Sequence, residues 1–394
     1  MTDIFKNTAI KFIILLGIVS LFADMTYEGA RSIAGQYLAI LGASGTIVGI
    51  VAGAGELIGY GLRIVSGYLS DRTGKYWTIT IIGYAINLLA VPLLALARHW
   101  ELAAALLITE RIGKAIRTPP RDAMLSHATA NTGRGWGFGL HEAMDQIGAI
   151  LGPLIVSAVL YFRGEYQMSF ALLLIPALLA ISVLLTARAL YPTPSDFEIS
   201  PPKVEKKGFS KAFWIYVIAI ALVAAAFVDF PLIAFHFKKT ALAPDSWLPI
   251  FYAVAMGVDA LAALVFGRLF DKFGISVLVT SVVLSMFFAP LVFFGGFWLA
   301  MLGMVLWGIG MGAQESIMKA VVANMVPSDK RSSGFGIFDA GYGICWFLGS
   351  VLIGCLYDIS IPWIIVFSVG AQFIAVILLL TITKANNLNT TEGL

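Results

Sequence analysis

The sequence predicts an all-α membrane protein with twelve transmembrane helices in two pseudo-symmetric six-helix bundles. Three observations predict this class. First, 59% of the 394 residues are hydrophobic and 12% are charged, which is about half the charged share of a globular domain. Second, apolar runs of about 20 residues, long enough to cross a bilayer, recur along the whole chain. Third, motifs of the first half recur in the same order in the second half.

Apolar runs and the short polar breaks between them place the twelve spans. In order, the spans are expected at residues 12–40, 46–69, 77–97, 100–128, 136–162, 168–190, 212–238, 247–269, 275–295, 297–325, 333–357 and 361–383. The segment 191–211 is rich in Pro, Ser, Lys and Glu, a composition that cannot form a core. It predicts a cytoplasmic linker between an N-terminal bundle, residues 1–190, and a C-terminal bundle, residues 212–394.

The basic residues predict the orientation. With both termini inside, the cytoplasmic segments hold fifteen lysines and arginines and the outer loops hold four. Such an excess is typical of the cytoplasmic side of membrane proteins. No cleavable signal peptide is evident, because the first apolar run lacks a clear small-residue cleavage site. We therefore expect a multi-pass protein of the inner (plasma) membrane with both ends in the cytoplasm.

Internal repeats relate the two halves. The tripeptide FAD ends at Asp24 and its counterpart FVD ends at Asp229, and a longer repeat aligns Glu142 with Asp339. A duplicated six-helix unit in one orientation is the parallel-repeat plan of secondary transporters, whose substrate site lies near the bilayer midplane. The longer pairs are GYLSDRTGK with GRLFDKFGI, from residues 67 and 267, and RGWGFGLHEAMDQIGAILG with RSSGFGIFDAGYGICWFLG, from residues 134 and 331.

The fourth span carries four cations within the stretch ERIGKAIRTPPRD, residues 110–122. Its counterpart in the repeat lies in an uninterrupted apolar span, so we expect the helix to continue through Pro119–Pro120 to about residue 128. Neighbouring helices or waters can satisfy the carbonyls that the prolines free. Charges at that depth mark a substrate or ion path, because they are costly against lipid. The alternative ends the helix near Gly113 and leaves the cations in a cytoplasmic loop.

GYLSDRTGK resembles the signature of the major facilitator superfamily between its second and third helices, and a degenerate second copy is also typical of that family. GAILGP, from Gly148, resembles the Gly-Pro signature of its proton-coupled antiporter branch. Arg111 stands where that branch often has an arginine, here within RIGK. ERIGKAIRTPPRDA and LHEAMDQIGAILGP are similar to a large, poorly assigned bacterial group of the superfamily. The resemblance covers essentially the whole chain and implies that the first, fourth, seventh and tenth helices line the cavity.

Four carboxylates are candidates for proton coupling. Asp24 and Glu28 are four residues apart and share one face of a helix. Carboxylates that lose their water near the midplane can exchange protons near neutral pH unless a close cation opposes it. Glu142 and Asp145 are the second pair of candidates. In the alternative interpretation, these acids only neutralise cations of a fixed network: Arg31, Arg111 and Lys114.

The cations of the fourth span also have two interpretations. In the first, they bind an anionic group such as a carboxylate or a phosphate, which arginine recognises in a forked geometry. In the second, they pair with nearby acids. Arg111 and Lys114 are the candidates for anion binding, because the later arginines lie nearer the predicted cytoplasmic end. The other candidates for substrate binding are Tyr27, Arg31, Asp229, His236 and Glu315, and Pro231 is expected to kink the helix beside Asp229.

The cytoplasmic face is expected to carry a gate. By resemblance, Asp71 approaches the N-terminus of the eleventh span near 332–334, where unpaired N–H groups and the positive helix end attract a carboxylate. Arg72 would add a charge contact across the same face. The remaining gating candidates are Arg117, Arg121 and Asp271, while Glu56 and Arg63 are expected to be structural or gating residues.

The sequence therefore predicts a proton-coupled secondary transporter of a small organic molecule that works by alternating access. The Gly-Pro motif favours export by antiport, and the cations favour an acidic or zwitterionic substrate, such as a metabolite or a carboxylate siderophore. Proton-coupled import, export of cationic drugs and a non-transporting membrane sensor are the alternatives. No nucleophile–base or metal-ligand constellation points to an enzyme, and no cofactor, metal or nucleic acid is expected. The expected partners are the substrate, protons and the lipid bilayer, with the chain as a monomer.

Overall fold

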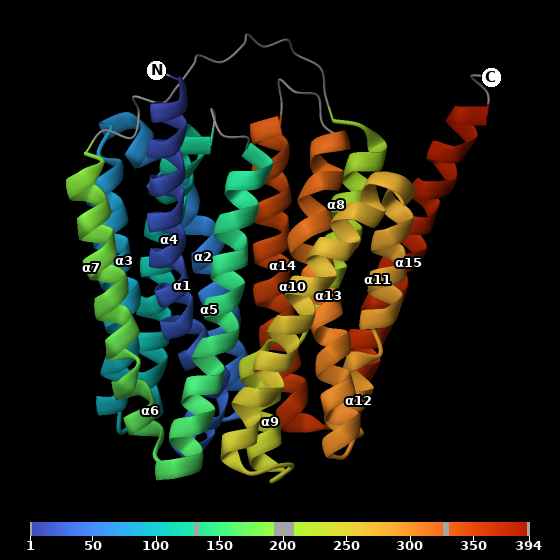
Figure 1. Ribbon diagram of the computed structural model, residues 1–394. Helices are drawn as coiled ribbons and strands as arrows, with labels where there is room; N and C mark the ends of the chain where they lie inside the picture. Colours follow the sequence, from blue (N-terminus) through green and yellow to red (C-terminus); the bar gives the residue numbers. More distant parts are fainter. Residues whose placement is uncertain (1, 130–133, 193–208, 326–330, 392–394) are drawn as a thin grey trace. The chain divides into compact units, whose positions relative to one another are not determined.

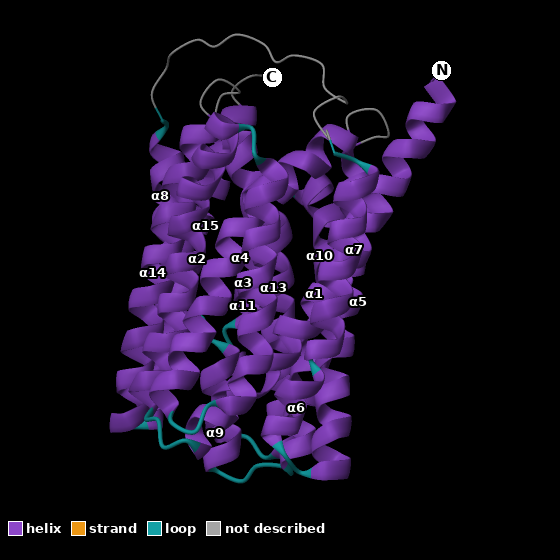
Figure 2. Cartoon of the chain, turned by 90° about the vertical axis from the view of Figure 1, so that its left-hand side faces the viewer, coloured by secondary structure: helices purple, strands orange, loops and turns teal. Residues whose placement is uncertain are grey.

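The computed structural model describes residues 2–129, 134–192, 209–325 and 331–391 (Figure 1). These residues form helices joined by short loops, and Figure 2 shows no strand among them. The first half contains α1 (Thr2–Ile40), α2 (Gly45–Thr73), α3 (Tyr76–Leu93), η1 (Leu94–Leu96), α4 (Trp100–Thr129), α5 (Arg134–Arg163), α6 (Tyr166–Leu172) and α7 (Leu174–Leu190). The second half contains α8 (Lys211–Ala226), α9 (Phe230–Lys239), η3 (Asp245–Trp247), α10 (Leu248–Phe273), α11 (Ile275–Ser285), α12 (Phe288–Phe294), α13 (Phe297–Met325), α14 (Arg331–Ile359) and α15 (Ile361–Thr391). The predicted all-α class is confirmed.

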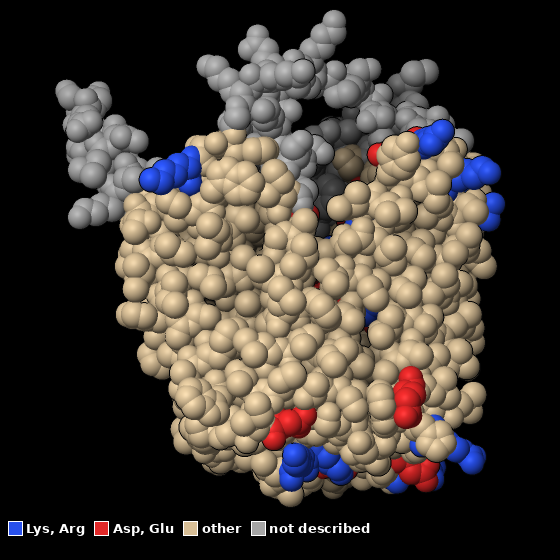
Figure 3. Space-filling model, turned by 180° about the vertical axis from the view of Figure 1, so that it is seen from behind, with Lys and Arg blue, Asp and Glu red and all other residues tan. Residues whose placement is uncertain are grey.

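The lengths and surfaces of the helices are those of a multi-pass membrane protein. Within the described residues, eleven segments are long and apolar enough to cross a membrane. The charged helix α4 is not one of them, although its 30 residues are long enough. Large apolar side chains such as Ile64 and Trp298 are exposed, and Figure 3 shows charged residues near the two ends of the helices with a wide uncharged band between them. Such a band is the surface that lipid covers.

The chain divides into two compact units. Unit 1 comprises Met1–Ala43, Ala54–Pro201 and Ala243–Ala253, and unit 2 comprises Ser44–Gly53, Pro202–Leu242 and Val254–Leu394. The helices α2 and α10 therefore each contribute residues to both units. Most of the predicted linker lies outside the described residues.

Helix α4 runs through Pro119 and Pro120 without a break. The ring of Pro120 removes the N–H that would otherwise bond to the carbonyl of Ile116. Ser66 of α2 donates its hydroxyl to that carbonyl oxygen at 2.5 Å. A neighbouring helix thus satisfies a carbonyl that a proline frees, as predicted. The alternative, in which the helix ends near Gly113, is wrong.

Three predicted spans are each built from two helices. The breaks separate α6 from α7, α8 from α9 and α11 from α12. In each case a proline stands four residues beyond a residue of the break or, between α6 and α7, beyond the last residue before it, where its ring clashes with the carbonyl of that residue. These prolines are Pro176, Pro231 and Pro290. The expected kink beside Asp229 is confirmed as a full interruption, because residues 227–229 are not helical.

Small residues let the helices of unit 1 approach closely. A Cβ atom added to Gly152 of α5 would lie 2.9 Å from the backbone nitrogen of Gly29 in α1, and one added to Gly148 would lie 3.0 Å from Cβ of Asp24. Glycine at such contacts is typical of packed membrane helices. The close approach brings the buried face of α1, with Asp24, directly against α5.

Candidate functional site

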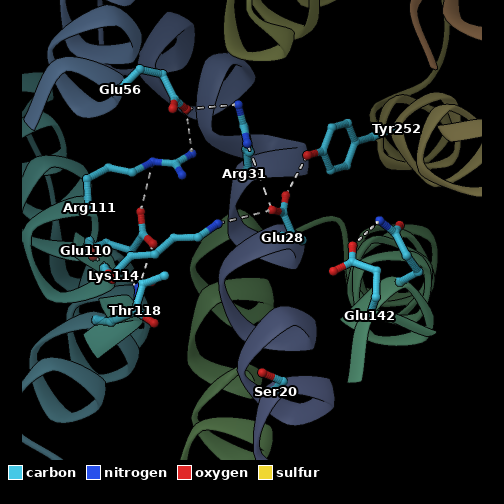
Figure 4. Close-up of polar contacts among 12 residues, drawn as sticks. Ser20, Glu28, Arg31, Glu56, Glu110, Arg111, Lys114, Thr118, Glu142 and Tyr252 are labelled. Atoms are coloured by element: carbon cyan, nitrogen blue, oxygen red, sulfur yellow. Dashed lines mark hydrogen bonds and ion pairs between the residues drawn. The ribbon is translucent and has the colours of Figure 1, made fainter. Parts of the chain in front are cut away.

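A group of six charged residues, here called the ion cluster, joins α1, α2 and α4 within unit 1 (Figure 4). Glu56 stands at its centre: Oε1 lies 3.4 Å from Nη2 of Arg31 and 3.8 Å from Nη2 of Arg111. Arg111 Nε lies 3.4 Å from Oε2 of Glu110. The other members are Glu28 and Lys114. Arg111 and Lys114 lie within helix α4 and not in a loop, as predicted for the fourth span.

Glu28 links the ion cluster to α10. The hydroxyl of Tyr252 donates a hydrogen bond of 2.5 Å to Oε2 of Glu28. The other carboxylate oxygen lies 3.9 Å from Nη1 of Arg31 and 4.0 Å from Nζ of Lys114. Glu28 is therefore held mainly by Tyr252, and its contact with Lys114 is the longest ion pair of the cluster.

Aromatic rings cover the cations that follow on α4. Nζ of Lys114 lies 3.9 Å from the centre of the Tyr27 ring. The guanidinium carbon of Arg117 lies 4.3 Å from the centre of the Tyr84 ring and 5.6 Å from that of Tyr27. Arg117 is 1% exposed, and its Nε and Nη1 make no hydrogen bond within the described residues. Cation–π contacts of this kind stabilise a cation that has left water.

The ion cluster is balanced in charge. Its three carboxylates, on Glu28, Glu56 and Glu110, face three cations, on Arg31, Arg111 and Lys114. Glu110 also accepts a hydrogen bond of 2.7 Å from Asn87 Nδ2. Each cation of the ion cluster thus has a carboxylate partner among the described residues.

Asp24 and Asp145 lie beside the ion cluster, on the packed faces of α1 and α5. Asp24 is buried and interacts electrostatically with Lys114, Arg117 and Glu28. Asp145 interacts with Asp24 as a like charge. Its Oδ1 makes no hydrogen bond within the described residues. The second predicted acid of α5, Glu142, is exposed and accepts a hydrogen bond of 3.3 Å from Gln146.

A histidine that the sequence analysis left aside lies next to Asp145. His141 is buried, with Nδ1 3.4 Å from Oδ2 of Asp145 and Nε2 3.1 Å from Oγ of Ser20. Arg121 donates from Nη1 to the same Oγ at 3.1 Å. It also pairs with Asp122, with Nη2 2.8 Å from Oδ1. This group joins α1, α4 and α5 in unit 1.

In unit 2, side chains support the interruption between α8 and α9. Asp229 accepts hydrogen bonds from Nε1 of Trp346 at 2.8 Å and from Oγ of Ser350 at 2.5 Å. Trp307 Nε1 donates to the carbonyl of Val228 at 2.9 Å, and Ser368 donates to that of Ala226 at 2.8 Å. Backbone groups freed inside a membrane need such partners. Asp229 is thus buried among donors of unit 2.

The other predicted residues lie in several places. His236 is buried in unit 2, with Nδ1 3.0 Å from the hydroxyl of Tyr357, and Glu315 is exposed on α13. Asp71 accepts a hydrogen bond of 3.0 Å from the hydroxyl of Tyr76, and Arg72 donates one of 3.4 Å to that of Tyr68. The side chain of Asp271 lies outside the described residues. The predicted latch between Asp71 and the start of α14 stays a prediction.

A carboxylate from α14 caps the N-terminus of α2 within unit 2. Asp358 accepts hydrogen bonds from the backbone nitrogens of Gly45 and Thr46, at 2.9 and 2.8 Å, and from the Thr46 hydroxyl at 2.6 Å. These bonds satisfy N–H groups that the first turn of a helix leaves unpaired. Substitution Asp358→Ala is expected to lower the free energy of unfolding by about 1–2 kcal/mol, as the loss of a helix cap does. Thermal unfolding of the purified protein in detergent measures this change.

Glu165 is the matched control for this prediction. It stands at the N-cap of α6 but makes no side-chain cap hydrogen bond. Glu165→Ala is therefore expected to change the free energy of unfolding by less than about 0.5 kcal/mol. Equal effects of the two substitutions would show that the Asp358 cap contributes nothing of its own.

Several residues of the site were missed by the sequence analysis. Tyr252 reaches Glu28 from α10, and no spacing in the sequence relates the two. Ser20 and His141 lie 121 positions apart. The one signal available was that His141 and Asp145 are four residues apart and share a helix face. Glu56, expected to be structural or gating, is the centre of the ion cluster.

A chain of membrane-spanning helices with a buried cluster of paired charges is, by class, a membrane transporter. The family model of the Major Facilitator Superfamily matches residues 16–275 and 212–393, so the chain belongs to this superfamily. It is 40% identical over 382 residues to an uncharacterized protein of Mycobacterium tuberculosis (strain ATCC 25618 / H37Rv), covering 95% of this chain and 93% of the relative. An uncharacterized MFS-type transporter of Methanocaldococcus jannaschii is 28% identical over 363 residues, which is 89% of each chain.

Two further matches have names that state an activity. The multidrug resistance protein MdtH of Proteus mirabilis (strain HI4320) is 33% identical over 128 residues, which is 32% of each chain. The crystal structure of the D323A mutant of the nucleoside transporter NupG has a TM-score of 0.76 and 16% identity, and covers 94% of this chain and 99% of that one. The likeness to NupG shows the shared fold. The predicted family and fold are thereby confirmed.

Proposed function

We propose that this protein is a proton-coupled secondary active transporter of a small organic molecule that carries an acidic group, either an organic anion or a zwitterion. The observation that carries the proposal is the balanced ion cluster with two buried acids, Asp24 and Asp145, beside it. Buried charges in membrane helices are costly and mark ion and substrate paths. Lys114 and Arg111 receive the acidic group of the substrate, and Asp24 and Asp145 carry the proton.

The balance of charge links the proton to the substrate. An anion that binds Lys114 must displace Glu28, its carboxylate partner at 4.0 Å. The anion also brings a negative charge next to Asp24, which interacts electrostatically with the same lysine. A proton on Asp24 offsets that charge and so favours the anion. This linkage is reciprocal, so each ligand raises the affinity for the other by the same factor. An acidic substrate and a proton therefore cross together.

Export by antiport is the second candidate, for a substrate with a positive charge. A cation and a proton compete for the same carboxylates, so one leaves when the other binds. The Gly-Pro motif at Gly148–Pro153 favours this mode by resemblance, and the partial match to a protein named for multidrug resistance agrees with it. Glu28 and Glu56 would then receive the substrate.

A ligand screen followed by a proton-flux assay tests the proposal. Purified protein is screened for thermal stabilisation with organic acids, zwitterionic metabolites, carboxylate siderophores and cationic dyes, and a stabilising compound is then added to proteoliposomes that contain a pH-sensitive dye. An acidic compound is expected to carry protons in its own direction. Asp24→Asn and Asp145→Asn are each expected to reduce this flux by a factor of about 100 or more, the upper range for a positioned proton-transfer group.

The control is Glu101→Gln, the same acid-to-amide change at an exposed position in the first turn of α4. It is expected to leave the flux unchanged. Stabilisation by cationic dyes alone, with protons moving against the dye, would replace the first candidate by the second. Substrate flux that does not depend on Asp24 or Asp145 would overturn the assignment of both acids.

A further inference from the structure

His141 is a buried, titratable group that the proposed transport mechanism does not use. Its ring contacts Ser20 of α1 and Asp145 of its own helix α5, and Arg121 of α4 acts on it electrostatically. Arg117 also acts on it electrostatically, and Asp24 acts on Asp145. The question is which of its two nitrogens carries the proton.

The neighbours of Ser20 and of the ring answer this question. A guanidinium group only donates hydrogen bonds, so Oγ of Ser20 must accept from Nη1 of Arg121 at 3.1 Å. A hydroxyl can accept two hydrogen bonds, and Ser20 also hydrogen-bonds Asp145, so the bond from Arg121 does not by itself fix the direction of the Ser20 hydrogen. The contact of the other ring nitrogen does: Nδ1 of His141 lies 3.4 Å from Oδ2 of Asp145, and a bare nitrogen there would face a carboxylate oxygen with no hydrogen between them. Nε2, 3.1 Å from Oγ of Ser20, is therefore the nitrogen of a neutral ring that accepts. A ring nitrogen that accepts a hydrogen bond carries no proton, so the proton of a neutral ring lies on Nδ1.

Two cations and one carboxylate surround the ring. A second proton would place a positive charge beside the guanidinium groups of Arg117 and Arg121, with only Asp145 to offset it. Arg121 itself does not release a proton. The order of donors is then Arg121 to Ser20 and Ser20 to His141, with Nδ1 of His141 directed at Oδ2 of Asp145, 3.4 Å away.

We infer that His141 is the positioning residue for Asp145, held by Arg121 through Ser20 as a neutral ring with its proton on Nδ1. The ring occupies Oδ2 of Asp145 and leaves Oδ1, which has no hydrogen-bond partner within the described residues, to take up a proton. The contacts of the ring stay the same whether Oδ1 of Asp145 holds a proton or has released it. The last step, that this is the transported proton, rests on the proposed function.

The protonation of the ring is measured directly by nitrogen NMR of the full-length protein with ¹⁵N-labelled histidine. The chain has four histidines, and His141→Gln assigns the signal of interest. The signal of His141 is expected to show a neutral ring protonated on Nδ1 from about pH 5 to pH 8. A signal from a charged ring would overturn the inference. So would a proton on Nε2, the arrangement in which Ser20 donates to Asp145 instead.

Two substitutions at Ser20 test the link to Arg121. Ser20→Ala removes the hydroxyl, and the His141 signal is expected to become a mixture of the two neutral forms. The infrared carbonyl band of protonated Asp145, identified by its loss in Asp145→Asn, is expected to change in frequency, because the carboxyl group loses its fixed donor. Ser20→Thr keeps the hydroxyl and is expected to restore both signals. A band that does not move in Ser20→Ala would show that the ring does not position Asp145.

The results separate the two proposals. A ring fixed on Nδ1 in a protein that moves no protons would leave the hydrogen-bond order standing and overturn the transport proposal. Proton-coupled transport with a charged His141 would do the reverse.

Discussion

Lys114→Gln is expected to weaken the binding of an acidic substrate by at least about 100-fold, within the range that follows when one partner of a buried charge pair is removed. Lys114 is the cation best placed to exchange partners. Its side chain is 21% exposed, the largest value among the residues of the ion cluster, and its contact with Glu28 at 4.0 Å is the longest. Binding is measured by calorimetry with a compound from the stabilisation screen.

The folded state is expected to survive this substitution. Glu28 keeps the hydrogen bond from Tyr252 and the contact with Arg31, so no carboxylate is left without a partner. Lys11→Gln, the same change at an exposed position of α1, is the control and is expected to leave binding unchanged. If Lys114→Gln instead lowered the melting temperature and the yield without a selective loss of binding, the fixed network would be the better description.

Glu56→Ala is expected to have the largest effect on stability, a loss of about 3–5 kcal/mol, which is the cost of removing one partner from a buried ion pair. The substitution takes the shared carboxylate from Arg31 and Arg111 at once, because both guanidinium groups approach its Oε1. Arg111 keeps Glu110 at 3.4 Å, but two like charges then face each other across the vacant position. Thermal unfolding in detergent measures the loss.

Glu142→Ala is the matched control for stability, because this glutamate is exposed on α5. Its effect on the free energy of unfolding is expected to stay within about 0.5 kcal/mol. An unchanged melting temperature for Glu56→Ala would mean that water, rather than Glu56, neutralises the two arginines. That result would also remove the physical basis for a closed, balanced ion cluster.

Most of the fold was predictable because it depends on local properties of the sequence. Hydropathy places the spans. The repeat correctly predicted that α4 continues through Pro119–Pro120, where the low helix propensity of proline alone would predict that the helix ends. The three interrupted spans were less accessible. Prolines are also present within α3 and α5, yet neither helix is interrupted at the residue four positions before the proline. Whether a proline interrupts a helix depends on donors from other helices, such as Trp307 and Ser368 beside α8.

The site was predictable only as far as charge in a membrane helix reveals it. Arg31, Arg111 and Lys114 stand out because such residues are rare at that depth. Their partners on other helices do not stand out. Nothing in the sequence around the glutamate of α2 or the tyrosine of α10 indicates that these residues pair with the cations. Ser20 is the extreme case: serine is common in helices, and its importance follows only from what Arg121 and His141 place around it.

The equal numbers of acids and bases in the ion cluster have an electrical consequence. A fixed charge that moves through the whole membrane field couples to the voltage by about 2.3 kcal/mol per 100 mV. Since the ion cluster sums to zero, the unloaded carrier is expected to change conformation at a rate that is insensitive to the potential across the membrane. Voltage then acts on the loaded forms, through the charges that protons and substrate bring with them.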